Sequence, residues 1–119
     1  MNQSDIEEIT GIVRTYYDSM YRGDGAGLRS AFDAHATFFG MRDGQTVRRT
    51  LDEFVEFVRG DDDADYEYRW DITLVDVCDV IGIVKLTDTY RGRRYTDYLT
   101  LAKGPDGWKI VNKAFLATS

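Results

Sequence analysis

The fold is decided by residues 80–103, which read VIGIVKLTDTYRGRRYTDYLTLAK. Apolar and polar residues alternate along much of this stretch, which is the period of a β-strand. Residues 80–90 are apolar on both faces in their first half, as a central strand is. Further along, Gly92-Arg93 has the composition of a two-residue hairpin turn. The stretch therefore predicts two adjacent antiparallel strands in the middle of a sheet.

Further strands flank this hairpin on both sides. Residues 68–77 alternate between apolar and polar side chains up to a turn at Asp79. After the hairpin, a Gly-Pro-Asp-Gly turn at residues 104–107 precedes an alternating stretch over residues 108–116. Consecutive strands joined by short turns predict an antiparallel meander.

The first half of the chain has the period of helices instead. Capping-box patterns begin two helices, and glycines end them. The predicted elements are a helix from Ser4 to Gly23, a short helix over 28–32, a strand over 36–41, a loop over 42–45, and a helix from Thr50 to Gly60. We therefore predict one α+β domain over residues 1–119, with N-terminal helices packed on a curved, mostly antiparallel sheet.

Composition narrows the possible partners. The chain has 119 residues and a net charge of -6, so it repels nucleic acid phosphates. No apolar run approaches membrane-spanning length, and the first residues lack the pattern of a signal peptide. Cys78 is the only cysteine, which favours a reducing compartment and a packing role for its thiol. We expect a cytoplasmic protein without a membrane or nucleic acid partner.

Several short motifs carry a family resemblance. They are YYD at 16–18, GD at 23–24, ATF at 36–38, TDYL at 96–99 and GWKIV at 107–111. With the order of helices and strands, they resemble the nuclear transport factor 2-like cone fold, in its SnoaL-like and lumazine-binding branch. The resemblance implies a cystatin-like cone, a fold that hosts isomerases, dehydratases, cyclases, carriers and dimerisation modules.

Ketosteroid isomerases, within the same fold, offer a comparison by residue. The resemblance implies that Tyr16 and Asp97 match the tyrosine and aspartate of an oxyanion hole. The position that matches the catalytic base is Gly40, which has no side chain to take a proton. Isomerase chemistry of that kind is therefore not implied for this chain.

Asp97 is the most informative candidate in its own right. It shares a strand face with apolar residues, so its carboxylate is desolvated unless it is paired. A solvent-accessible edge position, or a structural hydrogen bond to Tyr16, is the alternative. A turn at Gly92-Arg93 would place Asp88 directly opposite Asp97, as a pair of carboxyl groups.

Other candidates depend on the cone bringing them together. His35, the only histidine, is a candidate proton carrier, although the end of an exposed loop is the alternative. We expect Phe39, Phe54, Trp70 and Asn112 to join Tyr16 and Asp97 around a pocket, or else to be core residues. One His and one Cys exclude the usual zinc sites. Residues 61–65 lack the spacing of a calcium loop, and no glycine-rich phosphate loop indicates a cofactor.

Three functions remain open from the sequence. The first is binding of a small apolar or aromatic molecule in a mostly apolar pocket, preferred because Gly40 replaces the base. The second is a cofactor-independent isomerase, dehydratase or cyclase that uses Asp97 and Tyr16. The third is a dimerisation module with a vestigial pocket. We also expect a homodimer, since residues 80–90 are apolar on both faces and the helices can cover only one.

Overall fold

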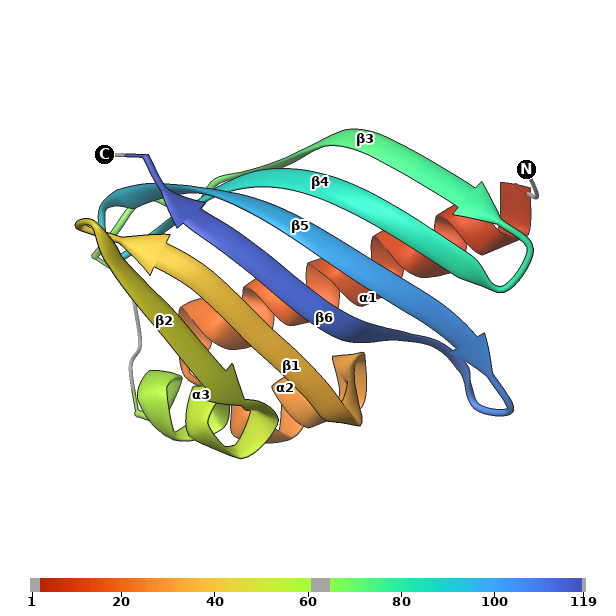
Figure 1. The fold of residues 1–119 in the computed structure, drawn as a ribbon, viewed down its shortest axis with the longest axis horizontal. Helices are drawn as coiled ribbons and strands as arrows, with labels where there is room; N and C mark the ends of the chain where they lie inside the picture. Colours follow the sequence, from red (N-terminus) through yellow and green to blue (C-terminus); the bar gives the residue numbers. More distant parts are fainter. Residues whose placement is uncertain (1–2, 61–64, 119) are drawn as a thin grey trace.

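The computed structural model describes residues 3–60 and 65–118, so most of the acidic stretch at 61–65 lies outside it. Its elements follow the predicted order, with one strand added (Figure 1). They are α1 (Gln3–Arg22), α2 (Gly25–Ala31), β1 (Phe32–Arg42), β2 (Gln45–Thr50), α3 (Leu51–Val58), β3 (Trp70–Cys78), β4 (Ile81–Tyr90), β5 (Arg93–Gly104) and β6 (Gly107–Ala117).

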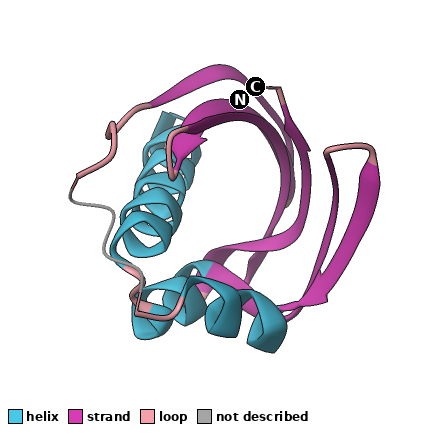
Figure 2. Cartoon of the chain, turned by 90° about the vertical axis from the view of Figure 1, so that its left-hand side faces the viewer, coloured by secondary structure: helices cyan, strands magenta, loops and turns pink. Residues whose placement is uncertain are grey.

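The strands form one six-stranded sheet in the order β2-β1-β6-β5-β4-β3. All neighbouring strands run antiparallel except β1 and β6, which run parallel. The sheet curves around the helices, as Figure 2 shows. This confirms the predicted α+β class and the curved, mostly antiparallel sheet.

The central hairpin has a different register from the one predicted. Its turn is Arg91-Gly92, and both residues have positive φ, 53° and 79°, as a type I′ turn requires. Asp97 therefore pairs with Leu86, and the predicted pairing of Asp88 with Asp97 is wrong. The shift is two residues, so the Asp88 and Asp97 side chains still share the concave face, as diagonal neighbours.

Strand β2 was not predicted, because its polar residues hide its strand period. Asp43 and Gly44 have positive φ and form the tight turn that joins β1 to β2. The strand ends at Thr50, which then caps α3 through the predicted capping box with Glu53. As an edge strand, β2 has the polar composition typical of that position.

Strand β6 contains a bulge that changes which side chains face inward. Thr100 pairs with Asn112, but the next residue along β5, Leu101, pairs with Ile110, so Val111 is the extra residue. Beyond the bulge the alternation shifts by one position. Lys113 is therefore buried on the concave face.

Helix α1 packs along the concave face of the sheet through fully buried side chains such as Ile9, Val13 and Tyr16. Near its start, Asp5 accepts hydrogen bonds from Trp108 Nε1 and Lys103 Nζ, both at 3.0 Å. These contacts join the helix to the strands beside the β5–β6 turn. Cys78, in contrast to its predicted packing role, is exposed.

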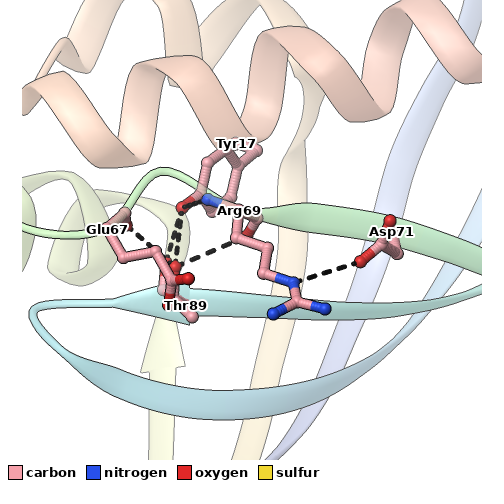
Figure 3. A network of polar contacts seen from close by, with 5 residues as sticks. All are labelled: Tyr17, Glu67, Arg69, Asp71 and Thr89. Atoms are coloured by element: carbon pink, nitrogen blue, oxygen red, sulfur yellow. Dashed lines mark hydrogen bonds and ion pairs between the residues drawn. The ribbon is translucent and has the colours of Figure 1, made fainter.

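A second polar network fixes α1 to the start of β3 (Figure 3). The Tyr17 hydroxyl donates to the carbonyl oxygen of Thr89 at 2.7 Å and accepts from the backbone N–H of Arg69 at 3.2 Å. The Thr89 hydroxyl donates to the carbonyl oxygen of Glu67 at 2.9 Å. The network fixes β4 immediately beside Asp88, which faces the interior.

Candidate functional site

Tyr16 and Asp97 meet inside the cone, as the sequence predicts. The Tyr16 hydroxyl donates a hydrogen bond of 2.7 Å to Oδ2 of Asp97, and both side chains are buried. Burial, followed by the nearby charges of Asp97 and Asp88, raises the pKa of Tyr16 well above its ordinary value. The hydroxyl therefore stays protonated and acts as a donor.

Asp88 adds a second buried carboxyl group beside Asp97. Both oxygens of Asp88 and Oδ1 of Asp97 lack a hydrogen-bond donor among residues 3–60 and 65–118. Burial, and then repulsion from Asp97, raises the pKa of Asp88 well above its ordinary range. A proton on Asp88 would allow this carboxyl group to donate a hydrogen bond to its neighbour Asp97.

Lys113 brings a cation into the same interior. Its Nζ lies 4.5 Å from the ring centre of Phe54, 5.0 Å from that of Tyr16 and 5.1 Å from that of Phe115. Burial lowers the pKa of Lys113, although Asp97 and Asp88 oppose that effect. We call Tyr16, Asp88, Asp97 and Lys113 the inner cluster.

A small cavity of about 20 Å³, enough for roughly one water molecule, reaches this cluster and opens to solvent. Its inner wall includes Asp88 and Lys113. Neither Tyr16 nor Asp97 lines this cavity, in contrast to the expectation that both surround the pocket. The residues around the cavity are Met20, Arg42, Arg49, Phe54, Phe57, Asp88, Tyr90, Tyr95, Lys113 and Phe115.

Gly40, at the position where the ketosteroid isomerase resemblance places a base, is blocked. A Cβ atom there would lie 2.3 Å from the ring of Phe115. That ring occupies the space that a side chain at position 40 would need. The structure agrees with the sequence that this position supplies no base.

The two phenylalanines predicted around the pocket lie on opposite sides of the sheet. Phe54 is buried and lines the cavity, as predicted. Phe39 is 38% exposed on the outer face, with Arg48 stacked over its ring at 4.8 Å. The alternation of β1 explains the difference, because Phe38 takes the inward position and stacks on Phe54 at 4.7 Å.

The remaining predicted residues also lie away from the cavity. Asn112 donates to Thr37 Oγ1 at 2.9 Å, because the bulge gives the inward position to Lys113. Trp70 stacks against Tyr17 and is only partly buried. His35 is exposed. The structure therefore groups Tyr16, Asp97 and Phe54 with Asp88 and Lys113, and separates the other predictions from them.

Lys113 is the site residue that sequence reasoning missed. A strict period of two along β6 places Asn112 inside and Lys113 outside. Lys113 faces inward because it pairs with Leu99 of β5, and this pairing depends on the bulge. A bulge cannot be placed from one sequence, since it depends on both paired strands.

Helices packed on the concave face of a curved six-stranded sheet, with a polar cluster inside, define the nuclear transport factor 2-like class. Within it, the chain belongs to the family described as "Putative lumazine-binding", whose model matches residues 4–116. No curated protein matches the chain in sequence.

Solved structures agree with this assignment. An NTF2-like protein of unknown function from Silicibacter pomeroyi has 28% identity and a TM-score of 0.91, over 99% of this chain and 100% of its own. One from Shewanella baltica has 19% identity and a TM-score of 0.89, over 100% and 98%. A ketosteroid isomerase-like protein from Erwinia carotovora atroseptica has 14% identity and a TM-score of 0.73, over 99% of both chains.

Within residues 3–60 and 65–118, no helix is long and apolar enough to cross a membrane. Over the same residues, no group of three or more His, Cys, Asp and Glu side chains is placed to hold a metal ion.

Proposed function

We propose that the chain binds a small, largely apolar or aromatic molecule at the mouth of the cavity. The observation that carries this proposal is the buried Asp88–Lys113 combination on the cavity wall. No ion pair within 4.0 Å joins Lys113 to either buried aspartate of the inner cluster. Burying such groups costs free energy, and a purely structural core avoids that cost with apolar side chains.

The family and the neighbouring folds support a ligand-binding or isomerase-like domain. The cavity size limits how a ligand enters. With about 20 Å³ enclosed, only a group of roughly the size of one water molecule fits beside Lys113. The body of the ligand then lies in the mouth, against the aromatic rings of Phe57, Tyr90 and Tyr95.

The test is a screen of small aromatic compounds by ligand-observed NMR, followed by titration of the hits. We expect hits to bind the parent protein and to lose at least about tenfold in affinity with Lys113→Met. Lys85→Met is the matched control, because Lys85 is on the outer face beside Tyr98. No hits, or equal losses in both variants, would contradict the proposal.

Proton transfer without a cofactor is a second candidate, favoured by the position of Asp88 on the cavity wall and by the raised pKa of its carboxyl group. A protonated Asp88 would donate its proton to the carbonyl oxygen of a ketone, and a solvent molecule at the open mouth would take the α-proton, while the Tyr16–Asp97 pair lies beside Asp88. The measurement is exchange of α-hydrogens of aromatic ketones in D₂O. A rate that falls with Asp97→Asn and with Tyr16→Phe supports this candidate, and a rate equal to that of buffer rejects it.

We also infer that the outer face of the sheet pairs with a second copy of the chain. Five large apolar side chains there are between 43% and 50% exposed, namely Leu74, Ile81, Ile83, Tyr98 and Leu116. Exposed apolar area of this kind is typical of an interface. Sedimentation velocity should show a dimer at micromolar concentration, and Ile83→Asp should give a monomer. We propose a cytoplasmic location for the protein, because its single cysteine favours a reducing compartment.

A further inference from the structure

Two arginines stand at the mouth of the cavity. Arg42, at the end of β1, and Arg49, on β2, both line it. The Arg49 guanidinium lies 4.0 Å from the ring centre of Phe57, and that of Arg42 lies 5.4 Å from the same centre. Arg42 Nη1 also donates to the Tyr95 hydroxyl at 3.4 Å. Stacking on one ring holds the two guanidinium groups close together.

Neither mouth arginine forms an ion pair within 4.0 Å in the described part of the chain. The ion pairs in residues 3–60 and 65–118 use other arginines. Arg93, in contrast, makes a bidentate pair with Asp43 at 2.9 and 3.1 Å, on the turn of the same β1–β2 hairpin. Asp43 at the hairpin turn thus pairs with Arg93 of β5, whereas Arg42 and Arg49 face the cavity without an ion pair.

The charge at the mouth is opposite to that of the whole protein. The chain carries a net charge of -6, yet two guanidinium groups and the Lys113 ammonium face one cavity. Burial, and then repulsion from Arg42, lowers the pKa of Arg49. The pKa of Lys113 is lowered mainly by burial, with Asp97 and Asp88 opposing, and Arg49 and Arg42 add smaller effects that lower it further. Glu53 attracts Arg49 more weakly than Arg42 repels it. An anion between the two arginines would offset that repulsion.

We propose that the ligand carries an anionic oxygen group, a carboxylate or a phosphate, that binds between Arg42 and Arg49. The planar guanidinium fork suits both groups, because it donates two parallel N–H bonds to two oxygens. The apolar part of the ligand then lies against Phe57 and Tyr90. This inference rests on the proposed binding function and specifies its ligand class.

Matched probes test the inference on the parent protein. Phenylacetate, phenyl phosphate, phenylacetamide and phenethylamine present a similar ring with different charges. We expect at least one anion to bind at least about tenfold more tightly than the amide at low salt, and the amine to bind most weakly. Preference for phenylacetate alone identifies a carboxylate, and preference for phenyl phosphate alone identifies a phosphate.

Variants then assign the preference to the two arginines. Arg42→Gln and Arg49→Gln should each remove most of the anion preference and leave amide binding within about twofold. Arg48→Gln is the control, because Arg48 lies next to Arg49 but stacks on Phe39 on the outer face. Arg49→Lys should retain part of the preference, since it keeps the charge but loses the fork.

The outcomes separate this inference from the proposed function. If the amide binds as tightly as both anions and Lys113→Met weakens all the probes, the inference is wrong and the binding function stands. If none of the probes binds the parent protein, both are rejected. An anion preference that survives both Arg→Gln substitutions also overturns the inference.

Discussion

Buried carboxyl groups lie against both ends of α1, but they differ in hydrogen bonding and in the direction of their pKa shifts. Near its start, Asp5 accepts hydrogen bonds from Trp108 Nε1 and from Lys103 Nζ. Hydrogen bonding to Trp108 and Lys103 lowers the pKa of Asp5. In the inner cluster, burial instead raises the pKa of Asp88, and its oxygens lack donors in the described residues.

This difference separates stability from function. Paired buried groups are what a stable core requires, whereas unpaired ones cost free energy and are retained mainly where they have another use. The Asp5 end fixes the helix to the sheet. The inner cluster, beside the cavity and the mouth arginines, is where we expect ligand chemistry.

The largest expected effect is a gain of stability from Asp88→Asn. An amide at this position keeps the shape, needs no proton from solvent at neutral pH, and can donate to Oδ1 of Asp97. We expect the free energy of unfolding at pH 7 to rise by about 1–4 kcal/mol. Urea denaturation measures it. Asp71→Asn is the control, because Asp71 is exposed, and it should change stability by less than about 0.5 kcal/mol.

A loss of stability in Asp88→Asn would mean that the carboxyl group is structurally paired after all. In that case the contrast between the two ends of α1 would not hold.

The Asp5 end should respond in the opposite direction. Trp108→Phe removes the indole N–H that Asp5 accepts and leaves a small void in a fully buried position. We expect a loss of about 1–3 kcal/mol. Trp70→Phe is the control, because Trp70 is only partly buried and its Nε1 bonds to the Tyr68 hydroxyl. Equal losses of stability in both variants would show that the hydrogen bond to Asp5 does not stabilise the fold more than the Trp70 contact does.

Periodicity and turn composition were enough to predict most of the architecture. The helical period before Gly23 and the strand period after residue 68 are both long, and long periodic stretches are predicted well. The Tyr16–Asp97 contact followed from the inward faces of two such elements together with the family resemblance. The contact lies between the parts of the chain with the strongest patterns.

Two wrong predictions, the Asp88–Asp97 pairing and the inward position of Asn112, came from shifts of one residue in a turn or a strand. A turn shifted by one residue in sequence moved Asp88 from opposite Asp97 to its diagonal neighbour. One extra residue, Val111, exchanged Asn112 for Lys113 on the concave face. Because the side-chain period of a strand is two, an odd shift reverses a face and an even shift preserves it. This explains why Asp88 stayed in the site and Asn112 did not.

The pH dependence of stability should report the raised pKa of Asp88. A carboxyl group whose pKa is higher in the folded state stabilises the fold below the pKa of the unfolded chain, about 3.9, and that contribution is lost as pH rises. The loss is at most about 1.4 kcal/mol per pH unit while only the folded state holds the proton. The ionisable groups that interact with Asp88 include Tyr16 and Tyr17 from α1, Asp97 from β5 and Lys113 from β6.

Urea melts at several pH values between 5 and 8 measure this slope. We expect the parent protein to lose stability toward pH 8 and Asp88→Asn to give a flatter profile. Lys113 has the opposite effect, because its pKa is lowered in the folded state. Between that pKa and the value in the unfolded chain, only the folded state has lost the proton, so stability rises with pH there. Parallel profiles for the parent and the variant would show that Asp88 is not the titrating group.

The smallest expected effect is the coupling between Tyr16 and Asp97. Their hydrogen bond of 2.7 Å joins Oδ2 of Asp97 to α1. A double-mutant cycle with Tyr16→Phe and Asp97→Asn should give a coupling of about 0.5–1.5 kcal/mol in urea denaturation. Tyr17→Phe with Asp97→Asn is the matched cycle, because the Tyr17 hydroxyl bonds to Thr89 instead, and its coupling should be near zero. If the Tyr16 cycle also gives no coupling, the inner cluster does not depend on this bond, and Tyr16 loses its role in positioning Asp97 beside Asp88.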